Sequence, residues 1–245
     1  GLHPLNEGRL LIVEERLVPN FGGAEYNPAR DSLLVMLTPG ASGGVDTLMR
    51  LPGREAITWV NYVDGRPVGT RQMAVPFGIR ALAAGAADRI AVVRAGEQGL
   101  GLFGLDGELE RLVRRSDVDP PEVSASIRQE FIDSTVETWA GTGSEEMMRR
   151  GAQQRLEFLP EGRRQPAFDR ILADVSSDRI WIRDFLPAWK TNGGRFWTVH
   201  DLDGRVLARV AAPAGLHLTQ VTSENLIGIE TDAMGVEYVV VYSLN

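Results

Sequence analysis

The segment Phe168-Asp-Arg-Ile-Leu-Ala-Asp-Val-Ser-Ser-Asp-Arg-Ile-Trp-Ile182 carries a pattern that recurs along the chain. An apolar strand leads through a short polar turn to an arginine or asparagine, and a second apolar strand follows. This order is typical of an antiparallel hairpin. Three further segments share it: Leu2–Val13, Ile79–Val93 and Leu216–Ile229. The recurrence of one unit predicts a repeat fold.

A second pair of strands follows each of the first three hairpins. The predicted pairs are Ser32–Thr38 with Val45–Leu51, Leu100–Leu105 with Glu108–Val113, and Arg195–Leu202 with Arg205–Val210. Asp106-Gly107 and Asp203-Gly204 favour hairpins because glycine accepts the positive φ of primed turns. The fourth repeat adds a single strand, Val236–Leu244. Four antiparallel strands per repeat predict an all-β fold, a β-propeller.

The spacing of the repeats indicates two insertions. A blade has ~40–50 residues, and only the interval from Arg179 to Asn225 matches that length. The interval from Arg9 to Arg89 also contains an insertion of two parts, the loop after Asn20 and the segment Gly53–Pro76, which has its own turn at Asp64-Gly65. The interval from Arg89 to Arg179 contains a predicted helical insertion, residues 120–160. We interpret residues 1–245 as one propeller domain or a fragment of one.

Two short helices are predicted in the insertion. Apolar side chains recur at three- and four-residue steps from Val123 to Trp139, which predicts a helix with one apolar face. Gly141 and Gly143 end this helix, and Thr142 with Glu145 can form a capping box for a second one. The apolar face predicts that the pair packs on the side or mouth of the propeller. A lid or docking surface is the alternative.

Composition excludes several classes of chemistry. The 245 residues include no cysteine, which removes disulfides, zinc–cysteine sites, iron–sulfur clusters and cysteine nucleophiles. The basic residues are arginines apart from Lys190, and they are scattered among acids. This distribution predicts no nucleic-acid partner. The chain has no apolar run near ~20 residues, so we expect no transmembrane segment.

The sequence resembles the bacterial six-bladed β-propeller proteins related to NHL-type propellers. The resemblance rests on Val45–Pro52, Val75–Gly78, Pro166–Phe168, Ile180–Ile182, Trp197–Gly204 and Met234–Tyr242. It implies a six-bladed propeller exported to the periplasm or the cell exterior, and it implies no reaction. Since about four blades are visible, we expect a C-terminal portion with two upstream blades missing. Closure of the visible blades in an atypical way is the alternative.

Loops at one mouth of a propeller are the expected place for a ligand, because loops on a rigid scaffold carry function. The loops at this mouth are Phe21–Arg30, Arg94–Gly99, Arg183–Gly194 and Glu230–Gly235. Asp184, Trp189 and Lys190 combine an acid, a flat apolar face and the only lysine. With Arg94, Glu230 and Asp232 they are the candidate ligand-binding residues. The alternative is that Phe185 and Trp189 cover the insertion helices.

Catalytic and metal-binding residues are not predicted. His3, His200 and His217 have no spacing that suggests shared metal ligation, and none lies in a triad pattern. We therefore expect a non-enzymatic binding or scaffold propeller without a cofactor, which takes an unknown small molecule or protein at its mouth. The alternative is a calcium-dependent lactonase or hydrolase of the gluconolactonase type. It would use loop carboxylates such as Asp184, Glu230 and Asp232.

Overall fold

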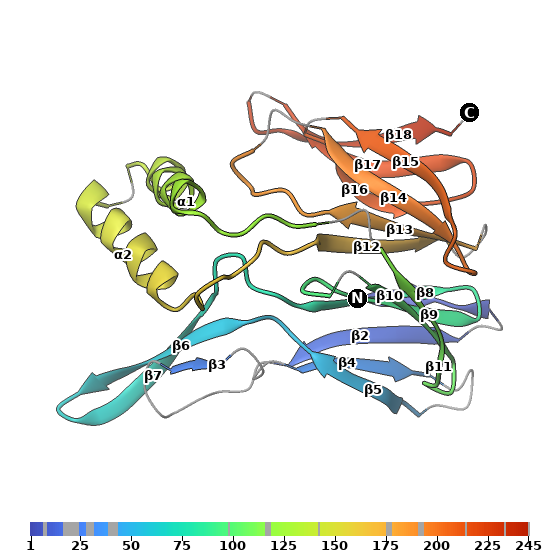
Figure 1. Cartoon of the computed structure of the whole chain (residues 1–245), viewed down its shortest axis with the longest axis horizontal. Coiled ribbons are helices and arrows are strands. Elements are labelled where there is room, and N and C mark those ends of the chain that lie inside the picture. Colours follow the sequence, from blue (N-terminus) through green and yellow to red (C-terminus); the bar gives the residue numbers. More distant parts are fainter. Residues whose placement is uncertain are drawn as a thin grey trace.

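In the residues that this computed structural model describes, the strands form antiparallel sheets, accompanied by two helices (Figure 1). The structure describes residues 1–6, 9–16, 25–27, 32–38, 44–97, 99–115, 119–141, 143–174, 178–190, 194–213, 215–232 and 234–244. In this part of the chain, neither helix is long and apolar enough to cross a membrane.

The predicted hairpins and strand pairs form four successive blades. The first blade contains β1 (Leu2–Pro4), β2 (Leu10–Arg16), β4 (Ser32–Leu37) and β5 (Asp46–Pro52); the second β8 (Ala81–Ala86), β9 (Arg89–Arg94), β10 (Gly99–Gly104) and β11 (Leu109–Arg114); the third β12 (Phe168–Asp174), β13 (Arg179–Asp184), β14 (Arg195–Asp201) and β15 (Val206–Ala212); the fourth β16 (His217–Val221), β17 (Asn225–Thr231) and β18 (Glu237–Ser243). These blades confirm the all-β propeller fold, with β1, β8, β12 and β16 as the inner strands. The count of six blades stays a prediction.

The three Asp-Gly turns differ in type. Asp64 and Gly65 both have positive φ, 51° and 72°, as a primed turn requires. At Asp106-Gly107 and Asp203-Gly204 only the glycine has positive φ, and the flanking register shifts by one residue. The prediction of primed turns was therefore wrong at these two sites. Their geometry is that of a longer turn with a bulge, in which glycine supplies the left-handed residue.

Buried apolar clusters fill the spaces between consecutive blades. Strands that lie between two neighbouring blades have continuous apolar runs. Ile90, Leu102 and Ile180 in these strands have no exposed surface. Small residues dominate β8 because inner strands crowd together. A Cβ on Gly85 would lie 2.7 Å from Cδ2 of Leu5 in the first blade. This close approach explains the sequence Ala-Leu-Ala-Ala-Gly-Ala of β8.

The two insertions pack against each other beside the blades (Figure 1). One supplies the three-stranded sheet of β3 (Glu25–Asn27), β6 (Ala56–Val63) and β7 (Arg66–Ala74); the other supplies α1 (Ala125–Thr138) and α2 (Glu145–Glu157). Phe131, Ile132 and Leu156 of the helices are buried in one cluster with Ile57 and Phe77. The apolar face of the helices is thus covered largely by the other insertion, rather than by a blade. In the predicted mouth loop 21–30, residues 25–27 form β3, and the rest lies outside the described residues.

Serine side chains cap both helices. Ser124 accepts a hydrogen bond from the main-chain N–H of Ile127, and Ser144 accepts one from Met147. The second helix therefore begins after Ser144, and the predicted capping residue Thr142 lies outside the described residues. Serine at this position satisfies one of the free N–H groups of the first turn.

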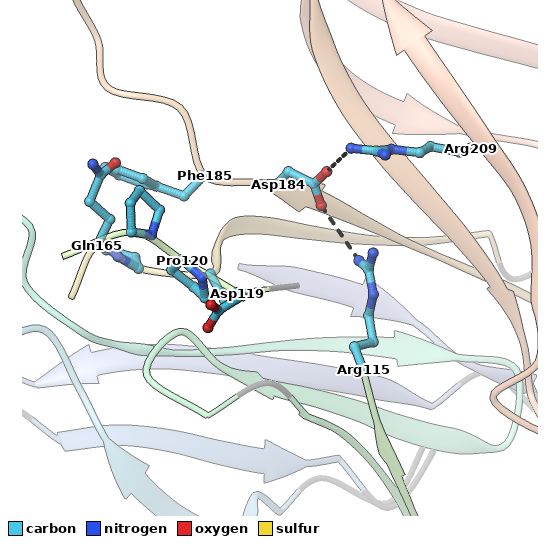
Figure 2. A pocket seen from close by; sticks show the side chains of 10 residues that line it. Arg115, Asp119, Pro120, Gln165, Asp184, Phe185 and Arg209 are labelled. Atoms are coloured by element: carbon cyan, nitrogen blue, oxygen red, sulfur yellow. Dashed lines mark hydrogen bonds and ion pairs between the residues drawn. The ribbon is translucent and has the colours of Figure 1, made fainter. Parts of the chain in front are cut away.

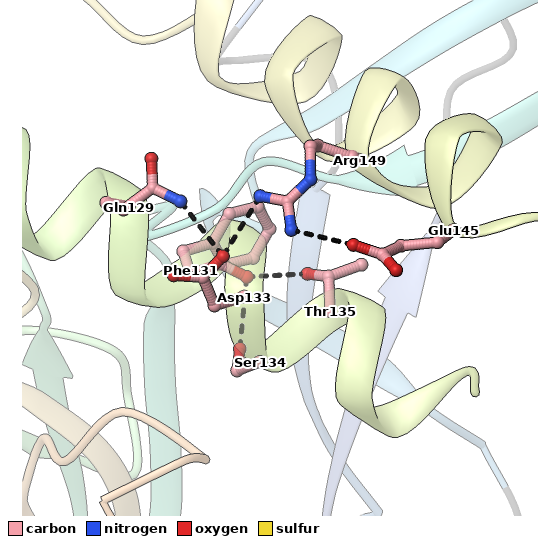
Figure 3. Close-up of polar contacts among 7 residues, drawn as sticks. All are labelled: Gln129, Phe131, Asp133, Ser134, Thr135, Glu145 and Arg149. Carbon is pink, nitrogen blue, oxygen red and sulfur yellow. Dashed lines mark hydrogen bonds and ion pairs between the residues drawn. The ribbon is translucent and has the colours of Figure 1, made fainter.

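Arg149 holds the two helices together by ion pairs (Figure 3). Its guanidinium donates to Asp133 of α1 at 3.0 Å and to Glu145 of its own helix at 3.1 Å. Asp133 also accepts a hydrogen bond from Gln129 at 2.9 Å. These carboxylates raise the pKa of Arg149 above its ordinary value. Carboxylates of the helical insertion thus balance the positive charge of Arg149.

Candidate functional site

Polar residues stand at the start of the inner strands. Arg80 directly precedes β8, Asp169 and Arg170 lie at the start of β12, and His217 is the first residue of β16. In each blade the start of the inner strand lies beside the end of the next strand. The three blades therefore bring these side chains to one end of the propeller.

Two inner strands carry a β-bulge at this end. The register of β12 against β13 skips Asp169, and the register of β16 against β17 skips Thr219. A bulge leaves one residue unpaired and redirects the neighbouring side chains. Both skipped residues line a shared cavity. The bulges thus help to turn polar groups toward it.

The cavity has a volume of about 490 Å³ and is lined by residues of all four blades. This volume lies within the range of small-molecule sites, ~300–1,000 Å³. Apolar side chains such as Leu33, Ala81 and Ile171 form part of its wall. Its charged residues are Glu15, Arg80, Asp169, Arg170 and Arg183, and its histidines are His3 and His217.

Asp169 is shared by several arginines. Its carboxylate accepts a hydrogen bond from Nε of Arg183 at 2.5 Å and lies 3.7 Å from Nη1 of Arg195. Its main-chain oxygen accepts one from Nη2 of Arg80 at 2.9 Å. Arg183 also lies over the ring of Trp197, with its guanidinium carbon 5.6 Å from the ring centroid. The carboxylate of Asp169 therefore pairs with two arginines, and its main-chain oxygen binds a third.

Arg170 donates a hydrogen bond to His217. The distance from Nη1 of Arg170 to Nε2 of His217 is 2.6 Å. Because a guanidinium only donates, Nε2 must accept, so the imidazole is neutral with its proton on Nδ1. Burial, and then the nearby Arg170, Arg183 and Arg195, lower the pKa of His217, while Glu237 opposes them. A neutral imidazole agrees with this direction.

Arg80 and Arg170 lack a carboxylate partner of their own. Over the described ranges, neither has a carboxylate oxygen within 4.0 Å. Glu15 accepts a hydrogen bond from the main-chain N–H of Arg54 at 3.0 Å instead. Burial is the largest cause that lowers the pKa of Arg170, and Arg183 and Arg80 lower it further against the effect of Asp169. The cavity thus contains cationic charge that these ion pairs do not balance.

The structure places the sequence-predicted residue Asp184 outside this cavity. Its carboxylate lies 3.5 Å from Nη1 of Arg115 and 2.9 Å from Nη2 of Arg209 (Figure 2). These residues line a smaller cavity of about 240 Å³, with Asp119 and Gln165 on its wall. Asp184 therefore has two cationic partners within the protein.

Trp189 and Lys190 lie at the insertion helices. The ring of Trp189 packs edge-on against Phe77 and Phe131, at centroid distances of 5.9 and 6.0 Å. Its Nε1–H donates to Glu130 at 3.0 Å, and Nζ of Lys190 lies 3.4 Å from the same carboxylate. These contacts match the alternative in which Trp189 covers the helices.

The remaining sequence-predicted residues also have local partners. Arg94 pairs with Glu97 at 2.9 Å, and Glu230 accepts a hydrogen bond from the hydroxyl of Tyr242 at 2.6 Å. Asp232 accepts hydrogen bonds from two main-chain N–H groups of its own turn. Glu230 and Asp232 are close together in the sequence. The structure does not bring the six predicted residues into one site.

The described residues do not fit the calcium site of the alternative function. Within the described ranges, no three histidine, aspartate or glutamate side chains gather closely enough to hold a metal ion. Asp184 has arginine partners, whereas Glu230 and Asp232 bind groups of the fourth blade. A calcium ion requires several oxygen ligands around one point.

The cavity residues could have been found by aligning the repeats. Each inner strand begins with an apolar residue followed by a basic or acidic one: Leu2-His3, Ile79-Arg80, Phe168-Asp169-Arg170 and Leu216-His217. Equivalent positions in blades lie around one axis. The prediction was confined to the mouth loops, whereas these residues lie at the starts of the inner strands.

Comparisons with known proteins identify no relative in sequence. No family model and no curated protein matches the chain. Two solved structures resemble it weakly in shape. One is a candidate 6-phosphogluconolactonase from Bacteroides fragilis, at 10% identity and TM-score 0.26 over 100% of this chain and 84% of that one. The other is the AfRom2 CNH domain, at 12% identity and TM-score 0.22 over 100% and 93%. These values assign no activity to the chain.

Proposed function

We propose that this chain is a non-enzymatic binding propeller that holds a small molecule in the cavity between its inner strands. The observation that carries the proposal is the cavity itself, which all four blades line with polar side chains on an apolar wall. A few polar groups on an apolar wall are typical of small-molecule sites. The export of the protein and the presence of further blades stay predictions from the resemblance.

Thr219→Trp tests this proposal by filling the cavity. Thr219 lines the cavity and is exposed, so a larger side chain can be placed there without repacking a buried cluster. Thr47→Trp is the matched control, because Thr47 is an exposed residue of the outer strand β5. Both variants should unfold at the wild-type urea concentration.

The readout is an NMR titration of main-chain amides with citrate, glucose, choline and trialanine. At least one probe should shift the amides of Ala81–Ala83 and Ile171 in the wild type and in Thr47→Trp. The same probe should leave them unchanged in Thr219→Trp. If no probe shifts these amides, or if the shifts persist in Thr219→Trp, the proposal is wrong. A turnover abolished by Asp184→Asn or Lys190→Ala would overturn its non-enzymatic part.

A further inference from the structure

The geometry points to a small anion with two or more negative charges as the ligand of the inner-strand cavity, bound by Arg80 and Arg170. This inference rests on the proposed function and names the chemical class of the ligand. Carboxylate and phosphate groups share the chemistry, because both present several acceptor oxygens to a guanidinium.

The charge of the cavity supports an anionic ligand. Arg80, Arg170 and Arg183 line it together with two carboxylates. Of these, Asp169 is already shared between Arg183 and Arg195, and Glu15 pairs with Arg54. A half-buried cation without a counter-charge is costly because the protein interior solvates charge poorly. An anion in the cavity would supply the missing counter-charge.

The hydrogen-bond donors support the same ligand. A guanidinium has five N–H donors. In the described part of the chain, Arg80 uses one of them on the main-chain oxygen of Asp169, and Arg170 uses one on His217. Each arginine therefore keeps donors for a ligand in the cavity that both line. The apolar wall strengthens such charged contacts by lowering the local dielectric constant.

The volume of the cavity limits the size of the anion. About 490 Å³ accommodates a phosphate ester or a tricarboxylate, but not a folded macromolecule. Asp169 and Thr219, at the two bulges, add polar groups to the lining of the cavity. A ligand that carries a hydroxyl beside its charged groups would fit this arrangement.

Isothermal titration calorimetry with citrate, inorganic phosphate and glucose tests the inference. We expect citrate or phosphate to bind the wild-type protein, with an affinity that falls as sodium chloride is added. Arg170→Gln and Arg80→Gln should each weaken the binding about tenfold or more. Arg205→Gln is the control, because Arg205 is exposed and lies in the turn before β15. It should bind within about twofold of the wild type, since its charge is remote and screened.

The outcomes separate this inference from the proposed function. If glucose, choline or trialanine shifts the cavity amides while neither anion binds, the cavity is a binding site for another class of ligand and the inference is wrong. Binding of citrate that is unchanged in Arg170→Gln and Arg80→Gln would also overturn it. If no probe binds in the cavity, both the inference and the proposed function fail. Thermal unfolding of each variant confirms that it is folded.

Discussion

Arg149 in the helical insertion and Arg170 in the inner-strand cavity are the same residue type in opposite surroundings. Two carboxylates contact Arg149 and raise its pKa, whereas burial and neighbouring arginines lower the pKa of Arg170. In the insertion, the carboxylates of Asp133 and Glu145 balance the charge of Arg149. In the cavity, Asp169 pairs with Arg183 and Arg195, and over the described residues no carboxylate oxygen lies within 4.0 Å of Arg170. The difference supports the proposal that Arg149 serves the fold and that Arg170 binds an anion.

The largest expected effect comes from breaking a buried ion pair at the base of the insertions. Oε1 of Glu55 lies 3.0 Å from Nη2 of Arg163, and each side chain is 7% exposed. Glu55→Ala should lower the free energy of unfolding by about 3–5 kcal/mol, because it removes the carboxylate that pairs with a buried cation. Urea denaturation measures this loss. Glu146→Ala, which removes an exposed partner of Arg150, should have no measurable effect. Equal losses in the two variants would contradict the structural role of the pair.

Trp189→Ala tests whether the packing of the insertion affects binding in the inner-strand cavity. The variant removes the contacts with Phe77 and Phe131 and should lower the free energy of unfolding by about 2–3 kcal/mol. Citrate affinity of the folded variant should stay unchanged, because Trp189 does not line the inner-strand cavity. Urea denaturation and calorimetry provide the two readouts. A folded variant with lost affinity would place the ligand at the Asp184–Lys190 loop instead.

Replacing Arg149 should destabilise the protein, whereas replacing Arg170 should not. Arg170→Met removes a half-buried cation that lacks a carboxylate partner, so the free energy of unfolding should stay unchanged or rise by up to about 1 kcal/mol. Arg149→Met removes two ion pairs between and within the helices and should lower the unfolding midpoint. Thermal and urea unfolding without added anions measure both. If both variants lose stability equally, the charge of Arg170 is balanced within the protein.

The smallest expected effect is a pH dependence that belongs to His217. Its pKa is lowered in the folded state, so near and below pH ~6.5 the unfolded chain binds more protons at this site. Stability should therefore fall as the pH falls from ~6.5 toward the folded-state pKa. Burial, and then Arg170, Arg183 and Arg195, oppose the charged form, and Glu237 favours it. Urea denaturation of the wild type and His217→Gln should show a steeper loss in the wild type. Identical pH profiles would refute this assignment.

The fold could be predicted from the sequence because its signals are local. Each hairpin combines apolar strands with a short turn, and the hairpin pattern recurs four times along the chain. The type of two turns could not be predicted, since the glycine pattern is shared by primed turns and by longer turns with a bulge. The sheet that covers the helices was also missed. Its strands β3 and β6 are far apart in sequence, and pairing between them is not visible in either alone.

The candidate site could be predicted only in its general position. The end of the propeller was the expected one, because the start of an inner strand lies beside the loops that follow the second strand. The residues that line the cavity were not the predicted ones. Asp184, Trp189 and Lys190 are prominent in sequence, yet they bind Arg115, Phe131 and Glu130. Arg80 and Arg170 look like ordinary surface arginines until the blades bring them together.

The sequence by itself determined the blades, since alternating apolar residues and turn residues act over a few neighbouring positions. The tertiary structure decided which charges are balanced. A carboxylate neutralises an arginine only across a few ångströms, and those distances arise from blade stacking and from the bulges at Asp169 and Thr219. The inner-strand cavity, with Arg80 and Arg170 on its wall, is a product of that packing.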